Sequence, residues 1–511
     1  MGESGWQVFA RVAAATPVVG SAPLLGTAVV LGGSVAGLLA ARVLADCAEQ
    51  VLVIEPDELD AGSEGATVTP SIRAGVPHGG QAHTLLPAGR VQLDRWFPGF
   101  TEQVAAAGAT LVSAEHVVDF LDGAPTHPSD LGEHLICSRA FLEHQIRVRT
   151  LAATNVRLLA GRGTGLRIEG TAVSAVRYVR ADGSEHLQPA DLVVDAMGRS
   201  SRLGDWLERA GWERPPLTRL PGYLDYATGW FRRSADRPEI AGATARYHQA
   251  SWPGGIAAAA ANAVEGRRWM VQLAGHRADP AAPELDFAAR CRAGLPSIFA
   301  EAAGGEQLGE IDIYLQADSR RRHFHRLVRA PARLVAVGDA VAADNPVHRH
   351  GLSSAALHAC CLAEYLRTAP DLTKPARAFF ELQRVVVDAA WQLSTAGESG
   401  LRPGRPGPGR PGSGGPGRVR PGRPPTWSTL SAATLRDVAR RRLAGWVEGQ
   451  VDAAAARDQV IAGRRAAVRD LLAHPATLAT PAITLRAVLA NQRARLPGRH
   501  PGPTPRSAPA D

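Results

Sequence analysis

The residues best suited to chemistry lie in one stretch, TAVVLGGSVAGLLAARVLADCAEQVLVIE, which runs from Thr27 to Glu55. Gly32 can adopt the backbone angles of a tight turn, and Gly37 has no Cβ, so a following helix can pack closely on the preceding strand. The start of that helix presents unpaired N–H groups and a positive dipole end to a pyrophosphate. Glu55 is placed to accept hydrogen bonds from ribose hydroxyls. The pattern predicts a dinucleotide-binding βαβ unit.

The turn of this unit departs from the usual fingerprint at one position. It reads Gly32-Gly33-Ser34, so a serine replaces the middle glycine. Ser34 still lets a phosphate approach, and its hydroxyl adds a donor. A glycine-rich string alone also fits an ordinary buried β-α turn, but the strand before it, the helix after it and the acid at Glu55 favour nucleotide binding.

Two more acidic residues follow apolar runs. Leu192–Val194 is expected to be a buried strand that rejoins the first sheet and ends in Asp195, before a small-residue turn through Gly198. Leu334–Val337 is expected to be another strand, which leads into Asp339. Each acid is a candidate cofactor ligand, and each can instead cap the turn that follows it.

Two helix starts are expected near these strand ends. An irregular loop after Asp339 should reach Gly351, and a helix should begin near Leu352. Its N-terminus is offered to something anionic or electron-rich. A second helix is expected over 136–150, with Ser138 as its N-cap and Arg139 in its first turn. Arg139 then either reaches a ligand or stays in solvent.

The composition argues against a nucleic-acid or membrane protein. The chain has 511 residues and a net charge of +8, but residues 401–425 hold six arginines and no acid, which leaves +2 for the rest. This distribution disfavours DNA or RNA binding. No apolar run approaches the roughly 20 residues that a transmembrane helix needs. The five cysteines have neither disulfide-framework nor metal-site spacing, which favours a reducing, cytoplasmic location.

Three motifs taken together resemble a known enzyme family. GGSVAG with Glu55, DAMGRSSR around Asp195 and VGDAVAADNP around Asp339 occur in the order found in the FAD-dependent aromatic-hydroxylase-like monooxygenases. The strings GVPHGGQAH, CSRAFLE, GRRWMVQLAG and VVDAAWQLSTAG make the chain look closer still to the bacterial branch that contains the polyether epoxidases. The resemblance covers roughly residues 27–397 and part of the C-terminal region.

The resemblance implies a fold, a cofactor and a set of site residues. The fold would be α/β, with a Rossmann-like FAD-binding domain interleaved with a β-sheet substrate domain and followed by a C-terminal helical region. FAD would be the bound cofactor and NAD(P)H a transient electron donor. The implied cofactor-binding residues are Gly32, Gly33, Ser34, Gly37 and Glu55 for the ADP half, Arg139 and Asp339 for the flavin phosphates and ribityl chain, Asp195 and Gly198 for a motif shared by FAD and the nicotinamide donor, and Pro346, Gly351 and Leu352 beside the isoalloxazine ring. The candidate catalytic residues are Arg349, His348 and His350, although paired loop histidines are more often solvated than catalytic, and no metal site is expected.

A Gly/Pro/His-rich loop in the first part of the FAD-binding domain should lead to a helix that starts near His83. The chain as a whole is expected to have seven segments. The segments are a disordered lead-in (1–26), the first part of the FAD-binding domain with inserted strands (27–215), a substrate-binding sheet domain (216–325), the second part of the FAD-binding domain (326–400), a Pro/Gly/Arg-rich linker (401–426), C-terminal helices (427–496) and a disordered tail (497–511).

Several positions depart from the family pattern and keep a second interpretation open. The family usually has Arg and His where this chain has Gly80 and Gln81, an apolar residue at Asp344, and a glycine at Arg349. Arg349 could block the approach of a ring, or stack its planar guanidinium on a ring or an anionic substrate. The alternative is a protein that keeps the fold without redox chemistry, as a cyclase, an isomerase or a ligand-binding protein.

The leading hypothesis is an FAD-dependent monooxygenase that inserts one oxygen atom, by epoxidation or hydroxylation, into a hydrophobic natural-product intermediate. The arginine-rich linker could attract an acidic carrier protein that bears the substrate. A flavin halogenase is disfavoured because the WxWxIP motif is missing and Lys374, the only lysine, lies outside the expected core. A nicotinamide-only dehydrogenase is disfavoured by the motifs at Asp195 and Asp339.

Overall fold

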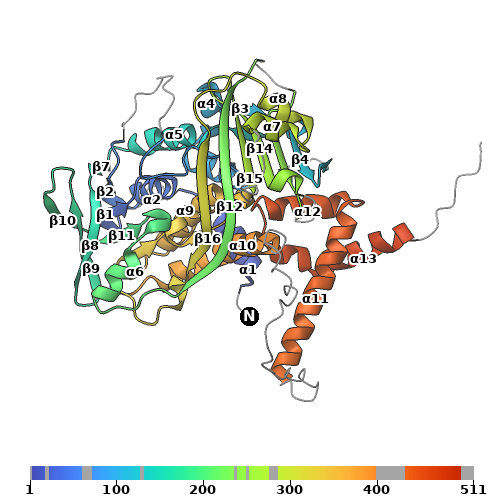
Figure 1. The fold of residues 1–511 in the computed structure, drawn as a ribbon. Coiled ribbons are helices and arrows are strands. Elements are labelled where there is room, and N and C mark those ends of the chain that lie inside the picture. Colours follow the sequence, from blue (N-terminus) through green and yellow to red (C-terminus); the bar gives the residue numbers. More distant parts are fainter. Residues whose placement is uncertain are drawn as a thin grey trace, which may run out of the picture. The chain divides into compact units, whose positions relative to one another are not determined.

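The computed structural model of the chain divides into two compact units (Figure 1). The first comprises Met1–Gly407 and Ala467–His474, and the second Pro408–Ala466 and Pro475–Asp511. The structure describes residues 3–17, 22–59, 72–126, 132–234, 239–248, 252–275, 286–398 and 432–495. The linker and tail predicted at 401–426 and 497–511 lie outside the described residues.

A five-stranded parallel sheet forms the centre of the first unit. The strand order is β17 (Leu334–Ala336), β11 (Leu192–Asp195), β1 (Leu25–Leu31), β2 (Ala48–Glu55) and β7 (Val156–Ala160). The central residues of the inner strands, among them Val29, Val53 and Val193, are apolar and buried, as expected for parallel strands covered on both faces. Figure 1 shows α2 (Val35–Ala45), the helix that follows β1, lying against this sheet. The predicted α/β fold class is confirmed, and β11 rejoins the first sheet as expected.

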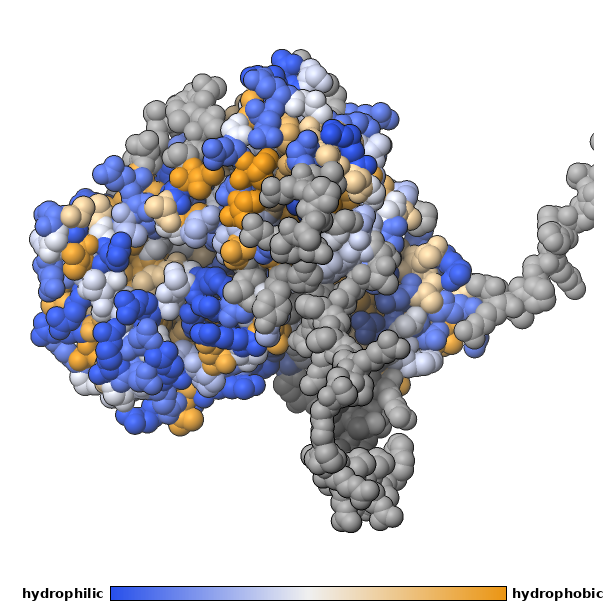
Figure 2. All heavy atoms as spheres, in the orientation of Figure 1, coloured by the Kyte–Doolittle hydropathy of each residue, from blue (hydrophilic) through white to orange (hydrophobic). Residues whose placement is uncertain are grey.

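An eight-stranded sheet forms the second layer of this unit, and only its β13–β4 pair is parallel. Its order is β18 (Ala342–Ala343), β16 (Asp312–Arg322), β12 (Leu217–Arg232), β15 (Arg268–Gly275), β14 (Ile256–Val264), β13 (Gly242–Arg246), β4 (Val117–Leu121) and β5 (Ala124–Pro125). Figure 2 shows hydrophobic residues gathered over part of β12 and β16, where Ile313 and Leu315 are exposed.

The two faces of this large sheet differ in chemistry because side chains alternate along each strand. Ala259 and Ala261 of β14 lie in an apolar cluster with Phe299 of α8 (Ser297–Ala302). On the opposite face the buried residues include Tyr226 and Thr228 of β12 and other polar side chains. The apolar face therefore holds the sheet to its helices, and the more polar face is left for a site.

The remaining elements of the first unit surround these two sheets. The small strands are β3 (Thr110–Val112), β6 (His134–Ile136), β8 (Arg162–Glu169), β9 (Ala172–Val179) and β10 (Glu185–Pro189). The α-helices, besides α2, are α1 (Gly5–Ala13), α3 (Pro87–Trp96), α4 (Phe100–Ala106), α5 (Arg139–Leu151), α6 (Leu203–Arg209), α7 (Phe287–Arg292), α8 (Ser297–Ala302), α9 (Gly351–Arg367) and α10 (Arg377–Glu398).

Two expectations about local structure were wrong. The lead-in 1–26 was expected to be disordered, but α1 forms there because one side of it, with Phe9 and Val12, is buried against α9 and α10. The helix expected near His83 begins at Pro87 instead, since proline is well suited to the first turn of a helix. His83 therefore lies in the preceding loop.

The second unit is helical, as the sequence predicted. It contains α11 (Ala432–Ala455) and α13 (Pro481–Arg495), and α12 (Gln459–Arg469) runs across the boundary between the units. Val451, Ile461 and Ile483 belong to its small apolar core. None of the helices in the described ranges combines the length and apolar character that crossing a membrane requires.

Removing the buried ring of α1 tests whether this helix is an integral part of the first unit. Phe9→Ala should lower the free energy of unfolding by about 3–5 kcal/mol, because Phe9 is 1% exposed and its removal leaves a cavity. Urea denaturation followed by circular dichroism measures the change. The control is Trp6→Ala on the same helix, where the side chain is 42% exposed. Equal, small effects of both changes would show that α1 is not docked.

Candidate functional site

The turn between β1 and α2 has the geometry expected of a phosphate-binding turn. Gly32 has φ +106°, and a Cβ on Gly37 would lie 1.9 Å from the Gly32 carbonyl oxygen. Only glycine fits at both positions. The first hydrogen bond of α2 runs from the Leu38 N–H to the Ser34 carbonyl at 2.9 Å. The preceding N–H groups of the helix are therefore left for a ligand.

The carboxylate of Glu55 is fixed beside this turn. It is 6% exposed, and it accepts hydrogen bonds from the N–H of Gly33 at 2.6 Å and of Asp57 at 3.1 Å. The guanidinium of Arg73 lies 3.3 Å from it and also bonds Asp57. The predicted ribose-binding residue is thus held at the end of β2 by backbone donors and one cation.

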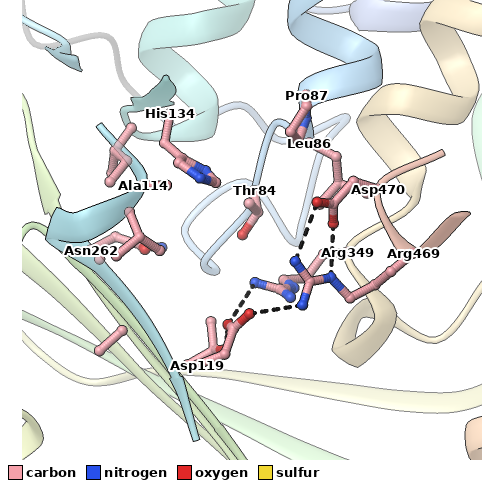
Figure 3. A pocket seen from close by; sticks show the side chains of 15 residues that line it. Thr84, Leu86, Pro87, Ala114, Asp119, His134, Asn262, Arg349, Arg469 and Asp470 are labelled. Carbon is pink, nitrogen blue, oxygen red and sulfur yellow. Dashed lines mark hydrogen bonds and ion pairs between the residues drawn. The ribbon is translucent and has the colours of Figure 1, made fainter. Parts of the chain in front are cut away.

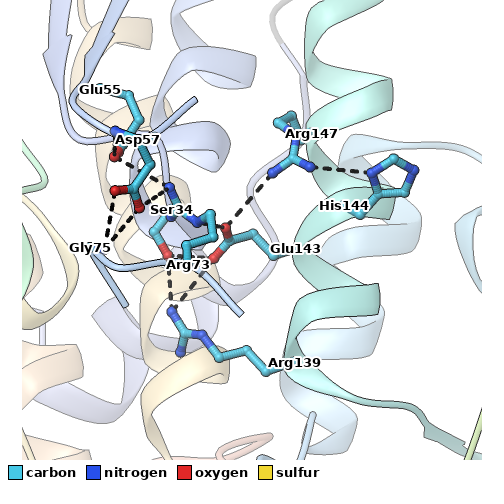
Figure 4. Close-up of polar contacts among 10 residues, drawn as sticks. Ser34, Glu55, Asp57, Arg73, Gly75, Arg139, Glu143, His144 and Arg147 are labelled. Carbon is cyan, nitrogen blue, oxygen red and sulfur yellow. Dashed lines mark hydrogen bonds and ion pairs between the residues drawn. The ribbon is translucent and has the colours of Figure 1, made fainter. Parts of the chain in front are cut away.

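Ser34 connects this turn to α5 through two hydrogen bonds (Figure 4). Its hydroxyl donates to Glu143 Oε2 at 2.7 Å and accepts from Arg139 Nη2 at 2.9 Å. Glu143 is 4% exposed and also pairs with Arg73 Nε at 2.8 Å and, at 3.9 Å, with Arg147. The serine that replaces the family glycine is therefore a connector between two elements.

Glu143 and Arg73 were missed by the sequence analysis. Glu143 stands one turn after Arg139 in the string CSRAFLE, and an i,i+4 pair of opposite charges was a usable signal. Arg73 gave no comparable signal, because it follows a long loop and meets Glu55 and Glu143 only in the folded chain. The N-cap serine of α5 behaves as the sequence suggests: Ser138 Oγ accepts from the Phe141 N–H.

The charges of Arg139 and Asp339 influence one another. Burial lowers the pKa of Arg139, and burial raises the pKa of Asp339, while the mutual attraction of the two groups opposes both shifts. Arg139 Nε has no hydrogen-bond partner among the described residues. Gly338 has φ +60°, and a Cβ on it would lie 2.5 Å from that of Ala36 in α2. The end of β17 therefore packs directly on the first turn of α2.

A histidine that the sequence analysis did not single out fixes the end of β17. His358 of α9 is 1% exposed, and its Nδ1 accepts a hydrogen bond from the Gly338 N–H at 2.9 Å. Burial lowers the pKa of His358 to about 4, so the ring is neutral and can act as an acceptor. The turn that carries Asp339 is thereby tied to α9.

Asp195 uses its carboxylate locally. It is fully buried and accepts hydrogen bonds from the Met197 N–H at 3.0 Å and from Ser201 Oγ at 2.5 Å. Burial raises its pKa, and these two bonds oppose the rise. Gly198 follows with φ +70°, where a side chain would be strained. In this structure the carboxylate stabilises the turn, and a role toward a cofactor stays a prediction.

The loop before α9 brings the predicted ring-side residues together. Pro346 starts a short 3-10 helix, η7 (Pro346–His348), and Gly351 starts α9, with Leu352 buried behind it. Arg349, between them, has φ +63°, the left-handed conformation that glycine adopts most easily. A glycine would suit this position for that reason. Arg349 occupies it while keeping the left-handed backbone conformation.

The two histidines beside Arg349 are uncharged at neutral pH. Burial lowers the pKa of His348 to about 3 and that of His350 to about 4. His350 contacts Ser394 Oγ and the Arg469 carbonyl, each at 3.3 Å, whereas His348 Nε2 has no partner in the described part of the chain. Both rings are neutral at pH 7, so neither supplies a positive charge to this loop.

The departures at Gly80 and Gln81 have partners in the large sheet. A Cβ on Gly80 would lie 2.3 Å from a carboxylate oxygen of Asp312. The side-chain oxygen Oε1 of Gln81 accepts hydrogen bonds from Thr228 Oγ1 at 2.7 Å and from Gln272 Nε2 at 3.0 Å, and all three side chains are buried. Gly80 therefore leaves room for Asp312 of β16, and Gln81 bonds β12 and β15 and fixes this loop to the sheet.

A pocket lies between the loop of Arg349 and the polar face of the large sheet (Figure 3). Its volume is about 50 Å³. Figure 3 shows Arg349 and Arg469 converging on the carboxylate of Asp119 in β4. Its lining residues are Thr84, Leu86, Pro87, Ala114, Val117, Asp119, His134, Ile136, Gly242, Ala243, Thr244, Asn262, Arg349, Arg469 and Asp470. Of the predicted catalytic residues, only Arg349 lines it. No group of side chains with metal-binding character occurs among the residues that the structure describes.

Removing the shared carboxylate of α5 tests the charge network around Ser34. Glu143→Leu should lower the free energy of unfolding by about 3–5 kcal/mol, because it leaves buried guanidiniums without their counter-charge. Urea unfolding measures the change. The matched control is Glu169→Leu, whose ion pair with Arg167 is exposed on both sides and should contribute no more than about 1 kcal/mol. A loss at position 143 no larger than at position 169 would contradict the network's importance.

The buried histidines predict a pH dependence of stability. His348 has an ordinary pKa of 6.5 when unfolded and about 3 when folded, so between these values the unfolded chain binds the extra proton. Its stabilising contribution is present above pH 6.5 and is lost as the pH falls, by roughly 1.4 kcal/mol per unit. Urea unfolding at pH 7.5, 6 and 5 should show a shallower decline for His348→Gln than for the wild type. Identical declines would rule out a neutral buried ring at this position.

Comparison with known proteins places this geometry in a fold and a family. No protein-family model matches the chain. Many solved structures share its fold, among them flavin-dependent halogenases and monooxygenases. p-Nitrophenol 4-monooxygenase from Pseudomonas putida DLL-E4 has a TM-score of 0.52 and 18% identity over 74% of this chain and 90% of that one. The Diels-Alderase PyrE3 has a TM-score of 0.52 and 16% identity over 87% and 80% of the two chains.

A curated relative is similar in sequence as well. Protein Rv3254 of Mycobacterium tuberculosis is 30% identical over 390 residues, which cover 72% of this chain and 79% of the relative. Most of the length of both proteins is therefore matched. The chain has the fold of the FAD-binding monooxygenases and belongs to the family of Protein Rv3254.

Proposed function

We propose that the protein is an FAD-dependent monooxygenase that inserts one oxygen atom into an organic substrate. The observation that carries the proposal is the grouping of three features around the carboxyl ends of β1 and β17: the free N-terminus of α2, Arg139, which bonds Ser34 at 2.9 Å, and Asp339, which follows the Gly338 that packs on Ala36. An extended dinucleotide needs such donors and acceptors in this order.

The residues present suit FAD in charge and in space. The unpaired N–H groups of α2 and the buried Arg139 match a pyrophosphate. The carboxylates of Glu55 and Asp339 match ribose and ribityl hydroxyls, and Gly32 and Gly37 keep the backbone close to the ligand. Bound FAD supplies electron transfer and oxygen activation, while the chain binds and orients the reactants and excludes water.

The proposal assigns roles to the parts of the first unit. Residues 27–215 and 326–400 would form the FAD-binding domain, and 216–325 the substrate-binding sheet domain. NAD(P)H is proposed as a transient donor, because the described residues contain one glycine-rich βα turn of this kind, at Gly32. The five cysteines are free and buried, which suits a reducing cytoplasm.

The finer chemistry is also part of the proposal. Epoxidation or hydroxylation of a natural-product intermediate, in the manner of the polyether-epoxidase-like branch, is supported by the strings GVPHGGQAH and CSRAFLE. Delivery of that substrate on an acidic carrier protein rests only on the arginine content of residues 401–425.

A second candidate keeps the fold without redox chemistry. It is favoured by Arg349, which occupies a left-handed position in the ring-side loop, and by the similarity to a Diels-Alderase. A cyclase or isomerase would then use the site to hold its substrate. Under this alternative Arg349→Gly should create or greatly strengthen FAD-dependent nicotinamide oxidation, whereas an already active wild type with an unchanged variant would speak against it.

Titration with FAD tests the proposed cofactor site directly. The wild-type protein should show a flavin absorbance spectrum or acquire one on addition of FAD. Asp339→Ala should weaken FAD binding at least tenfold, about 1.4 kcal/mol, because an acceptor for ribityl hydroxyls is lost. Asp205→Ala, at an exposed acid of α6, serves as the control. A colourless protein that takes up no FAD would refute the proposal.

A further inference from the structure

The guanidinium of Arg349 lies in the pocket with few partners. Its contact with another side chain in the described residues is an ion pair with Asp119, 3.8 Å from Nη1 to Oδ1, and it makes no side-chain hydrogen bond there. Its side chain is only 19% exposed. A guanidinium carries five N–H donors, and none of the Arg349 nitrogens is among the fully buried atoms without a partner. These donors are therefore open to an acceptor that enters the pocket.

The backbone conformation of Arg349 also supports a binding role for this residue. A non-glycine residue at φ +63° carries a conformational cost and persists where the surrounding structure fixes it. The Arg349 N–H is bonded to the Pro346 carbonyl at 2.9 Å, which holds the residue in this turn. The arginine is thus presented to the pocket by a strained but fixed loop.

The charges around the pocket favour an anion. The guanidiniums of Arg349, Arg469 and Arg246 act on Asp119, and Asp470 pairs with Arg469. The two guanidiniums and two carboxylates that line the pocket balance one another, because burial lowers the pKa of His134 in the pocket wall and leaves that ring neutral. Arg246, which also acts on Asp119, adds one positive charge from outside the lining. Burial alone would raise the pKa of Asp119, but the guanidiniums lower it to about 2, so it is ionised at neutral pH.

Asp119 marks the place where a carboxylate is accepted. One of its oxygens accepts a hydrogen bond from Thr244 Oγ1, and the other lies 3.2 Å from Arg469 Nη1. It reaches Arg349 only at the longer distance of 3.8 Å. A second carboxylate would therefore find Arg349 with most of its donors available.

The size of the pocket limits what can enter. A water needs roughly 10–15 Å³ of such space, so a volume of about 50 Å³ holds about four waters. That is enough for a carboxylate group, but far below the roughly 300–1,000 Å³ of a pocket for a whole drug-sized ligand. The remainder of such a ligand must lie outside this volume.

We infer that this pocket binds the carboxylate of an organic acid, with Arg349 as its anchor, and that the substrate of the protein is therefore a carboxylic acid. Carboxylate binding is inferred from the pocket alone. The role of the bound acid as a substrate rests on the proposed monooxygenase function. A planar guanidinium can bind both carboxylate oxygens at once, which a lysine could not. The other anion that an arginine recognises in this way, phosphate, is larger and more highly charged than the pocket suits.

Binding of acetate and its neutral analogue acetamide to the full-length protein, with FAD added, tests the inference. Ligand-observed NMR at constant ionic strength should show acetate binding at least tenfold more tightly than acetamide. Arg349→Gln should abolish this preference. The matched control is Arg333→Gln, since Arg333 also has a left-handed backbone, φ +61°, and a single long ion pair, 3.9 Å to Asp191. Inorganic phosphate binding more tightly than acetate would overturn the assignment to a carboxylate.

A second variant gives the opposite sign and does not depend on the folding of Arg349→Gln. Asp119→Asn removes the carboxylate that competes for Arg349 and Arg469, so acetate should bind severalfold more tightly. Equal binding of acetate and acetamide to the wild type, or weaker acetate binding to Asp119→Asn, would overturn the inference. Repeating the measurement without FAD separates it from the proposed function: acetate selectivity without flavin uptake would refute the monooxygenase and leave the carboxylate site standing.

Discussion

The parallel pairing of β1 with β11, and of β11 with β17, is the constraint on which the site depends. Leu31 lies opposite Asp195, and Asp195 lies opposite Ala336, so three strands end at one edge. The chain can leave that edge only through tight turns, because α2 packs directly on them: Gly37 meets the Gly32 carbonyl and Gly338 meets Ala36. The glycines at positions 32, 37 and 338 are required by this close packing. Parallel strands that end together bring residues from distant parts of the sequence to one place.

Buried charge holds the edge in shape. Glu143 joins Arg73, Arg139 and Ser34, and Glu55 accepts a hydrogen bond from the backbone of the turn between β1 and α2. Such charges are stable in a protein interior only when each has a partner, so the network resists displacement of any member. The serine in place of a family glycine gains its meaning here, since it links the turn to α5. A ligand that bound at α2 would meet a preformed and already polarised surface.

The large sheet contributes the other wall by separating its two faces. Alanines of β14 pack on helices, while Thr228, Gln272 and Asp119 lie on the opposite face, where Thr228 and Gln272 bond the side chain of Gln81. The polar face is fixed by its own hydrogen bonds. A small pocket with two arginines remains beside the ring-side loop, and its charge rather than its volume distinguishes it. A wholly apolar substrate would make no ion pair with these arginines.

The sequence by itself determined the features that depend on neighbours in the chain. The βαβ unit, the capped start of α5, the strands ending near Asp195 and Asp339, and the helix at Gly351 are all readable, because glycines, caps and apolar runs act locally. The α/β class follows from their order. What local patterns cannot show is which distant residues meet. Glu143 with Ser34, His358 with Gly338, and Arg349 with Asp119 are neighbours only after the sheets pack. Burial likewise turned α1 from an apparently disordered lead-in into a helix, and made His348 neutral. Tertiary structure decided these points because burial and long-range charge pairing exist only in the folded chain.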